Sequence, residues 1–480
     1  MRSVMSHQFS RSPQARIPRS SFDRSHGHKT TFDAGLLIPF YVDEALPGDT
    51  FNARLTAFAR MATPLFPVMD NLRMSFFFFA VPNRLLWVNW EKFCGAQDDP
   101  GDSTDFTIPT FSSTSSAGAG GLFDYMGLPT GVSDVLVGTS ALFFRAYNLI
   151  WNEWFRDQNL QNSLTVETDN GPDGTSIYSV QRRGKRHDYF TSALPFLQKG
   201  DAVELPLGTE ANVMFSGDPT SGFVMGAYST NDSSWSAFAD GDANVVTTDV
   251  GTVSAGGQLK ADLSTATAAT VNQLRQSVQI QRLLERDARG GTRYIEVIKA
   301  HFGVTSPDYR LQRPEYLGGG SIPVNISAVA QTSATGLTGG STNQGSLTAF
   351  GTAGGRVGFS KSFTEHCILI GLVCVDADLT YQQGLERMWS RSTRYDFYWP
   401  ALAHIGEQSV LNKEIYFDTA GAGTNDNVFG YQERYAEYRY KPSRISGQFR
   451  SSHGTSLDPW HLSEDFSALP VLNASFITSE

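Results

Sequence analysis

Three stretches of the chain have the hydrophobic pattern of β-strands. From Phe51 to Arg60 apolar residues occupy every second position, with Asn52, Arg54 and Thr56 on the other face, and this alternation predicts a half-buried strand. The run from Leu72 to Val81 places aromatic rings on both faces, so we expect that strand between two layers. Residues 368–375 are almost wholly apolar and predict a central strand.

Helical spacing marks three other segments. In residues 140–156 an apolar face repeats at helical spacing, and Arg145, Asn148 and Glu153 are expected opposite it. Residues 271–289 and 295–302 predict two more helices, because Gly290-Gly291 interrupts the pattern between them.

Long segments separate these elements and show little periodicity. Residues 97–116 are rich in Asp, Ser, Thr and Gly and predict a loop. Residues 208–262 and 321–359 predict two further excursions without a core of their own. Ordinary domains rarely carry such loops without a partner. Together with the strands, this organisation favours a mainly β fold, a jelly roll with long loop and helical insertions.

Composition and cysteine content limit the class of protein. The chain has 480 residues, of which 40% are hydrophobic and 18% charged, a globular profile with low surface charge. Its three cysteines, Cys94, Cys367 and Cys374, form no disulfide framework, and their spacing does not suit zinc, so we predict no bound metal or cofactor. Without a signal peptide or a long apolar run, we expect folding in a cytoplasm and no membrane contact.

Charge is unevenly distributed along the chain. Residues 1–29 contain six basic residues and one acid, a net charge of +5 on a chain of −10. We predict residues 1–30 to be a basic N-terminal arm, and 31–480 to be one domain. Residues 208–262 contain seven acids and one lysine, which predicts an exposed acidic insertion.

A search for catalytic motifs identifies none with the required spacing, so we do not expect an enzyme. Phosphate loops, nucleophile elbows and zinc-protease motifs are missing from the sequence. Two basic segments instead are candidates for nucleic-acid contact, because cations bind phosphates. These residues are Arg2, Arg11, Arg16, Arg19, Arg24 and Lys29 in the arm, and Arg182, Arg183, Lys185 and Arg186 further along.

A third segment interleaves tyrosines with basic residues near the C-terminus. Aromatic faces and cations together suit unpaired bases and phosphates, but Tyr and Arg are also enriched where proteins meet. We favour a subunit interface and keep stacking on single-stranded DNA as the alternative. The residues are Tyr435, Tyr438, Arg439, Tyr440, Lys441 and Arg444.

Several ordered blocks resemble the major capsid proteins of the gokushoviruses, a branch of the Microviridae. They run through nearly the whole chain and leave out mainly residues 208–262 and parts of 325–360. The blocks are FDRSHGHKTTFDAGLLIPFYVDEALPGDTF from Phe22, PVMDNL from Pro67, VPNRLLWVNWEKFCG, RGKRHDYFTSALPFLQKG from Arg183, QSVQIQRLLERDARGGTRYIEVIKAHFGVTSPDYRLQRPEYLGG from Gln276, DLTYQQGLERMWSR and YAEYRYKPSRISG.

This resemblance implies an eight-stranded antiparallel jelly roll whose copies form a T=1 icosahedral shell around a circular single-stranded DNA genome. The arm would face inward, and residues 208–262 would form protrusions at the three-fold axes. It also implies a small basic DNA-binding phage protein, an internal scaffolding protein, a pilot protein and a host cell-surface receptor as partners. The virion, assembled in the bacterial cytoplasm, would be its location. Receptor-facing candidates are Phe223, Tyr228, Trp235 and Phe238.

Two functions of other classes compete with this interpretation. A carbohydrate-active β-sandwich enzyme or lectin would use the same loops and aromatics, but it requires a pocket with paired carboxylates. A single-stranded DNA-binding module would bind tightly and in a salt-sensitive manner as a monomer, without assembly.

Overall fold

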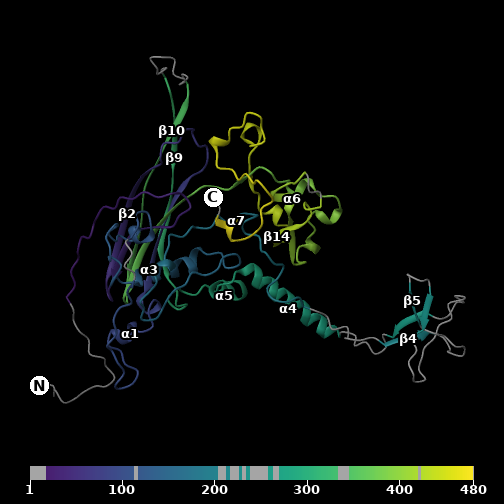
Figure 1. Cartoon of the computed structure of the whole chain (residues 1–480), viewed down its shortest axis with the longest axis horizontal. Helices are drawn as coiled ribbons and strands as arrows, with labels where there is room; N and C mark the ends of the chain where they lie inside the picture. Colours follow the sequence, from purple (N-terminus) through teal and green to yellow (C-terminus); the bar gives the residue numbers. More distant parts are fainter. Residues whose placement is uncertain are drawn as a thin grey trace.

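Two antiparallel β-sheets packed face to face form one side of the molecule (Figure 1). The computed structural model describes residues 18–112, 117–203, 212–216, 226–229, 234–237, 258–262, 270–332, 345–419 and 423–478. The first sheet has the order β1 (Ile38–Ala45), β11 (Cys367–Asp376), β3 (Arg73–Pro82), β8 (Glu315–Pro323). The second has the order β2 (Thr50–Arg60), β10 (Leu347–Ser362), β9 (Asn325–Ala330).

Strand β3 lies between two layers, as its aromatic run predicts. Phe76 and Phe78 belong to the clusters that pack between the two sheets. Phe77 and Phe79 point the other way, into the cluster that contains helix α3 (Leu142–Ile150). The predicted strands of residues 51–60, 72–81 and 368–375 are therefore confirmed, and β11 is central, paired with β1 and β3.

The predicted helix of residues 140–156 is present as α3 followed by a π-helical turn, Trp151–Phe155. Its predicted polar face is wrong, because Arg145 and Asn148 are fully buried. Arg145 forms an ion pair with Asp173, and Asn148 donates to the backbone carbonyls of Thr165 and Ile177. Partners on a distant loop thus let a polar helix face enter the core.

Helices α4 (Val271–Gly290) and α5 (Tyr294–Phe302) confirm the two later helices. The side chains of Thr270 and Gln273 form a capping box at the start of α4. Gly291, with a φ of 96°, ends it in a conformation that favours glycine.

The predicted excursion of residues 321–359 is wrong, because it contains β9 and most of β10. Ala349, Ala353 and Phe359 face inward, and the strands pair along their backbones. Because β9 and β10 contain many small residues, their sequences show no strong apolar alternation that would predict strands.

A second hydrophobic cluster lies outside the sandwich and joins the C-terminal part of the chain to residues 189–193. It contains Tyr189, Phe190, Val410, Ile415 and Phe476. Around the two clusters the remaining helices are α1 (Trp90–Phe93), α2 (Leu122–Tyr125), α6 (Asn412–Ile415) and α7 (Ala474–Thr478). Short 3₁₀ turns are Asn83–Leu85, Thr175–Ile177, Arg387–Trp389, Arg394–Asp396, Pro400–Leu402, Ala436–Tyr438, Gly447–Phe449 and Asp458–Trp460.

Among the residues that the structure describes, four two-stranded sheets lie in addition to the sandwich: β4 with β7, β5 with β6, β12 with β15, and β13 with β14. Within residues 208–262, β4 pairs with β7 and β5 with β6. The strands are β4 (Asn212–Ser216), β5 (Gly226–Ser229), β6 (Ser234–Ala237), β7 (Gln258–Asp262), β12 (Thr380–Tyr381), β13 (Glu407–Leu411), β14 (Val428–Glu433) and β15 (Ser443–Arg444). Among the described residues the packed sheets have four and three strands, so the mainly β class is confirmed and the eight-stranded jelly roll stays a prediction. The division into arm and single domain also stays a prediction.

Cysteine reactivity tests this fold directly. Cys367 and Cys374 are buried in β11, whereas Cys94 is exposed. Burial raises the pKa of the Cys367 thiol to about 12. We expect iodoacetamide to modify Cys94 in the native chain and to reach the other two only after unfolding in urea, as measured by mass spectrometry. Modification of Cys374 as fast as Cys94 would contradict a central β11, and Cys94→Ser serves as the control.

Candidate functional site

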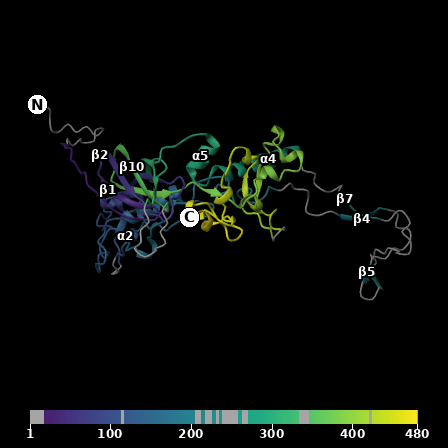
Figure 2. The same cartoon turned by 90° about the horizontal axis from the view of Figure 1, so that it is seen from above.

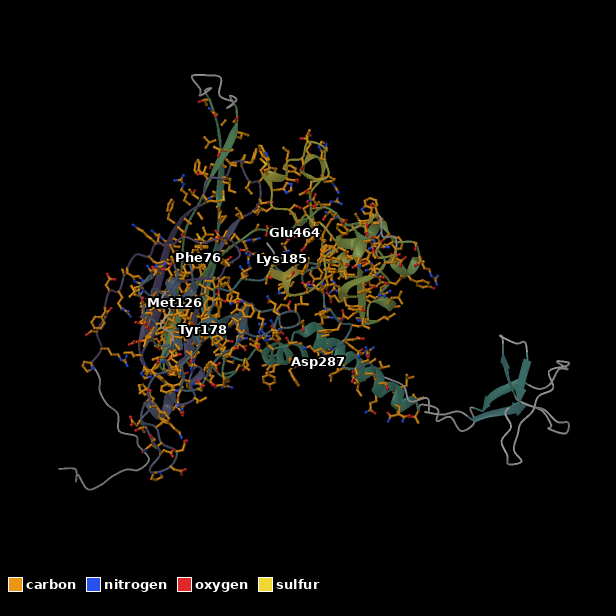
Figure 3. The ribbon with its side chains drawn as sticks, viewed as in Figure 1. Phe76, Met126, Tyr178, Lys185, Asp287 and Glu464 are labelled. Carbon is orange, nitrogen blue, oxygen red and sulfur yellow. The ribbon has the colours of Figure 1, made fainter. Side chains whose placement is uncertain are left out.

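The basic segment of residues 182–186 lies between the sandwich and the C-terminal cluster. The side chain of Lys185 is only 1% exposed, with its Nζ 2.5 Å from Oε1 of Glu464 and 4.9 Å from the ring centroid of Phe476. Figure 3 labels Lys185 and Glu464 at this junction. The prediction that Lys185 contacts nucleic acid is therefore corrected: its charge is buried against the protein's own carboxylate.

Two neighbours of Lys185 also have internal partners. Arg183 and Arg186 both pair with Asp376 at the end of β11, and Nη1 of Arg183 lies 3.6 Å from Oδ1 of Asp376. Arg182 is exposed and is held by backbone contacts, since its carbonyl accepts a hydrogen bond from Trp151. Of this segment, Arg182 presents the most accessible cation, and its contact with nucleic acid stays a prediction.

Replacement of Lys185 distinguishes the two roles. We expect Lys185→Met to lower the free energy of unfolding by about 1–3 kcal/mol, because the partly buried Glu464 loses its charged partner. Urea unfolding of the purified chain measures this change. Arg182→Gln, an exposed neighbour, is the control and is expected to leave stability unchanged. A Lys185→Met chain of normal stability but with weaker oligonucleotide binding would restore the nucleic-acid role.

The described part of the arm runs along the outside of the sandwich. Residues 18–31 are exposed throughout. Arg19 donates to the carbonyl of Gly48, and Nη1 of Arg24 lies 2.9 Å from Oδ2 of Asp43 in β1. Lys29 is exposed, whereas Arg2, Arg11 and Arg16 lie outside the described residues. The described residues of the arm therefore lie beside the strands β1 and β2.

Exposed aromatic rings gather in the C-terminal part of the chain. Each of them is between 47% and 68% exposed. We call this set the aromatic surface: Trp389, Tyr395, Phe397, Tyr398, Trp399, Tyr438 and Tyr440. The guanidinium of Arg391 lies 4.3 Å from the ring centroid of Tyr438 and 5.4 Å from that of Phe397, so the two chain segments form one surface.

Only part of this surface is predictable from the sequence. Tyr438 and Tyr440 were predicted, but the five rings between Trp389 and Trp399 were missed. Four aromatic residues among the five positions 395–399, directly before a proline, are the available signal. Tyr435 is corrected, because it is buried and packs beneath Tyr398, with ring centroids 5.2 Å apart.

Four basic residues of the aromatic surface form ion pairs with the chain's own carboxylates, whereas Arg394 lies over the ring of Tyr395, 4.7 Å from its centroid. Arg439 lies 2.5 Å from Glu433, and Arg391 lies 3.3 Å from Glu437. Glu386 forms ion pairs with both Arg444, at 2.9 Å, and Lys441, at 3.9 Å. A surface on which most cations are already paired offers phosphates little net charge. Its composition of aromatic residues and paired arginines is that of a protein–protein contact.

A cavity of about 280 Å³ opens beside this surface, between Phe190, Trp389 and Arg450. The carboxylates that line this cavity already have hydrogen-bond or ion-pair partners within the chain. Glu414 accepts from Arg387 and from the hydroxyl of Tyr189, and burial raises the pKa of Glu414. Carboxylates held in this way do not form the free pair that a glycoside-cleaving enzyme requires. Among the residues that the structure describes, no cluster of His, Cys, Asp and Glu suits a metal ion, and no helix could cross a membrane.

The receptor-facing candidates lie in the insertion. Tyr228 in β5 and Trp235 in β6 are partners in the strand register. Phe223 and Phe238 lie outside the described residues. The coloured strands β4, β5 and β7 lie apart from the rest of the molecule, beyond α4, in both views (Figures 1 and 2).

Comparisons with known proteins find similarity along nearly the whole chain. The family model described as capsid protein (F protein) matches residues 10–480. The chain is 48% identical over 496 residues to capsid protein VP1 of Bdellovibrio phage phiMH2K, covering 98% of this chain and 90% of that protein. It is 42% identical to capsid protein VP1 of Chlamydia phage 1, over 99% of this chain and 92% of that protein. It is 36% identical to capsid protein VP1 of Spiroplasma virus 4, over 99% of this chain and 90% of that protein.

Proposed function

Because the chain belongs to the capsid protein (F protein) family of phages, we propose that its copies assemble into a closed T=1 icosahedral shell around a circular single-stranded DNA genome. Membership makes it a structural protein of the virion and not an enzyme, and it confirms the resemblance to gokushovirus capsid proteins. The further details of shell and genome are our proposal.

The aromatic surface is the observation that carries the assembly proposal. Single-chain proteins rarely leave a large contiguous apolar patch in water, whereas chains that associate cover it. Seven rings about half exposed, next to charges of which most are already paired, fit a neighbouring subunit. Helix α4 adds a second candidate contact, because Val271, Leu274 and Leu283 are 45–67% exposed.

The charge distribution supports a DNA-containing shell with additional partners. The chain has a net charge of −10, so it cannot by itself neutralise a genome. An inward-facing arm supplies cations at the inner surface, and the deficit requires a small basic DNA-binding protein. A scaffolding protein and a pilot protein complete the set of phage partners that we propose.

The acidic insertion is proposed to form the three-fold protrusions and to meet the host receptor. Its seven acids and its strands beyond α4 are consistent with an outward position. Deleting residues 225–255 is expected to leave assembly intact and to abolish adsorption to host cells. Unchanged adsorption of the deleted particles would refute the receptor role.

Electron microscopy of the chain, expressed together with the other genes of its phage, tests the proposal. Closed isometric particles with knobs at the three-fold axes are the expected result. Soluble monomers in spite of the full gene set would overturn the T=1 shell.

A further inference from the structure

The second sheet of the sandwich is covered on only one side. Inward residues of β2 and β10, such as Leu55 and Val357, pack against the first sheet. The first sheet is covered on its other side by α3, but the outward residues of the second sheet remain exposed. We call these outward residues the open sheet face: Thr50, Asn52, Arg54, Thr56, Phe58 and Arg60 of β2, Phe350, Thr352, Gly354, Arg356, Gly358, Ser360 and Ser362 of β10, and Asn325, Ser327 and Val329 of β9.

The strand register brings arginines and phenylalanines together on this face. Residues directly opposite in an antiparallel pair point to the same side, and diagonal neighbours lie about 7–8 Å apart. Phe58 is opposite Gly354, so no side chain covers its ring, which is 79% exposed. Arg356 is the diagonal neighbour of Phe58, and Arg60 follows Phe58 on the same side. Phe350, 41% exposed, is diagonal to Arg60.

The charge of the open sheet face is entirely positive. It contains three arginines and no acidic residue, on a chain whose net charge is −10. Arg54 and Arg356 form no ion pair with any residue that the structure describes, and Arg60 donates only to the hydroxyl of Thr63, at 3.5 Å. This contrasts with the aromatic surface, where Arg439 and Arg444 are paired with glutamates.

The basic arm lies next to this face. Arg19 contacts Gly48, two residues before β2 begins, and the purple N-terminal segment passes outside β2 in Figure 1. Among the described arm residues, Arg19 therefore lies at the edge of this face, beside the start of β2.

We propose that the open sheet face binds single-stranded DNA, with phosphates at Arg54, Arg60 and Arg356 and unpaired bases stacked on Phe58 and Phe350. This inference deepens the proposed function and rests on it, because it names the surface of the shell protein that meets the genome. Flat aromatic rings between unpaired cations suit single strands of any sequence. A second copy of the chain is less suited, because it would have to place a carboxylate against each of the three unpaired arginines, whereas a DNA strand carries a phosphate at every nucleotide.

Binding of a fluorescein-labelled oligo(dT) strand to the full-length chain over a series of salt concentrations tests the proposal. Arg54→Gln and Arg356→Gln are each expected to lower the slope of log K against log salt by about 0.7, the value of one single-strand phosphate contact. Phe58→Leu, which keeps an apolar side chain without a π face, is expected to weaken binding about 5- to 150-fold. Arg439→Gln and Arg444→Gln are matched controls, exposed but paired, and should leave the slope unchanged.

Equal loss in the control variants, or unchanged binding in Arg54→Gln, Arg356→Gln and Phe58→Leu, would overturn the proposal. All these side chains are exposed, so thermal unfolding should match the wild type and exclude misfolding. A subunit contact would instead prevent particles from forming in these three variants, with oligo(dT) binding unaltered, and this result also overturns the DNA site. Failure of the wild-type chain to form particles refutes the shell, whereas the oligo(dT) result independently decides the site.

Discussion

Replacement of Arg145 by leucine is expected to lower the free energy of unfolding by about 3–5 kcal/mol, a large part of the total stability of a typical domain. The side chains of Arg145 and Asp173 are both 0% exposed. Nε and Nη2 of Arg145 donate to the two carboxylate oxygens of Asp173 at 2.8 Å and 2.5 Å. Removing the guanidinium leaves a buried carboxylate with the hydroxyl of Tyr178 as its remaining side-chain donor.

The same guanidinium also joins three segments of the chain. Its Nη1 donates to the carbonyl of Leu86, at 3.0 Å, just after β3, and to that of Asp169, at 2.9 Å. Loss of Arg145 therefore leaves the carbonyl of the buried Leu86 without this donor, in addition to the carboxylate, and an unpaired polar group in a core is costly. Urea unfolding of the purified chain, followed by circular dichroism, measures the loss.

Two variants show whether the buried charge is the cause. Arg145→Leu with Asp173→Asn should recover part of the lost stability, because the unpaired carboxylate is gone. Arg439→Leu, which breaks an ion pair whose arginine is 53% exposed, should cost less than about 1 kcal/mol. Equal effects of Arg145→Leu and Arg439→Leu would contradict the central role of the buried pair.

The contrast between these arginines shows what sequence patterns can and cannot predict. Helical spacing located α3 but assigned Arg145 to solvent, because its partner is 28 residues away and periodicity contains no information on distant pairs. Lys185 was assigned to nucleic acid for the same reason, since Glu464 lies far along the chain. Charge counts identify cations, but only the fold shows which of them are neutralised.

Strands were predicted where side chains differ strongly in polarity and missed where they do not. The phenylalanine run of β3 and the apolar run of β11 were unambiguous. Strands β9 and β10 consist largely of small residues, so pairing by backbone hydrogen bonds determines them. The β2 half of the open sheet face can be predicted from the sequence, because the alternation of residues 51–60 puts Phe58 on the same side of the strand as Arg54. Its second half, on β10, required the structure.

Removing two rings of the aromatic surface is expected to abolish closed particles while leaving the chain folded. In Trp389→Ala with Tyr440→Ala, the changed rings are 68% and 47% exposed, so thermal unfolding should stay near the wild-type value. Exposed Trp and Tyr are typical hot-spot residues, and truncating one commonly costs about 2–4 kcal/mol of binding. In a closed shell every copy loses the same contact, so the loss repeats at each interface. Electron microscopy and sedimentation of the co-expressed variant measure particle formation.

Phe58→Leu on the open sheet face is the matched control, since Phe58 is also an exposed ring that lies near arginines. We expect it to form particles and to bind oligo(dT) more weakly, whereas the Trp389/Tyr440 variant should bind oligo(dT) normally and form none. We expect the two variants to differ in this way because of charge. Arg391 and Arg444 on the aromatic surface are paired with glutamates, whereas the arginines beside Phe58 are not. Particles that assemble normally from the Trp389/Tyr440 variant but contain less DNA would instead assign the aromatic surface to base stacking.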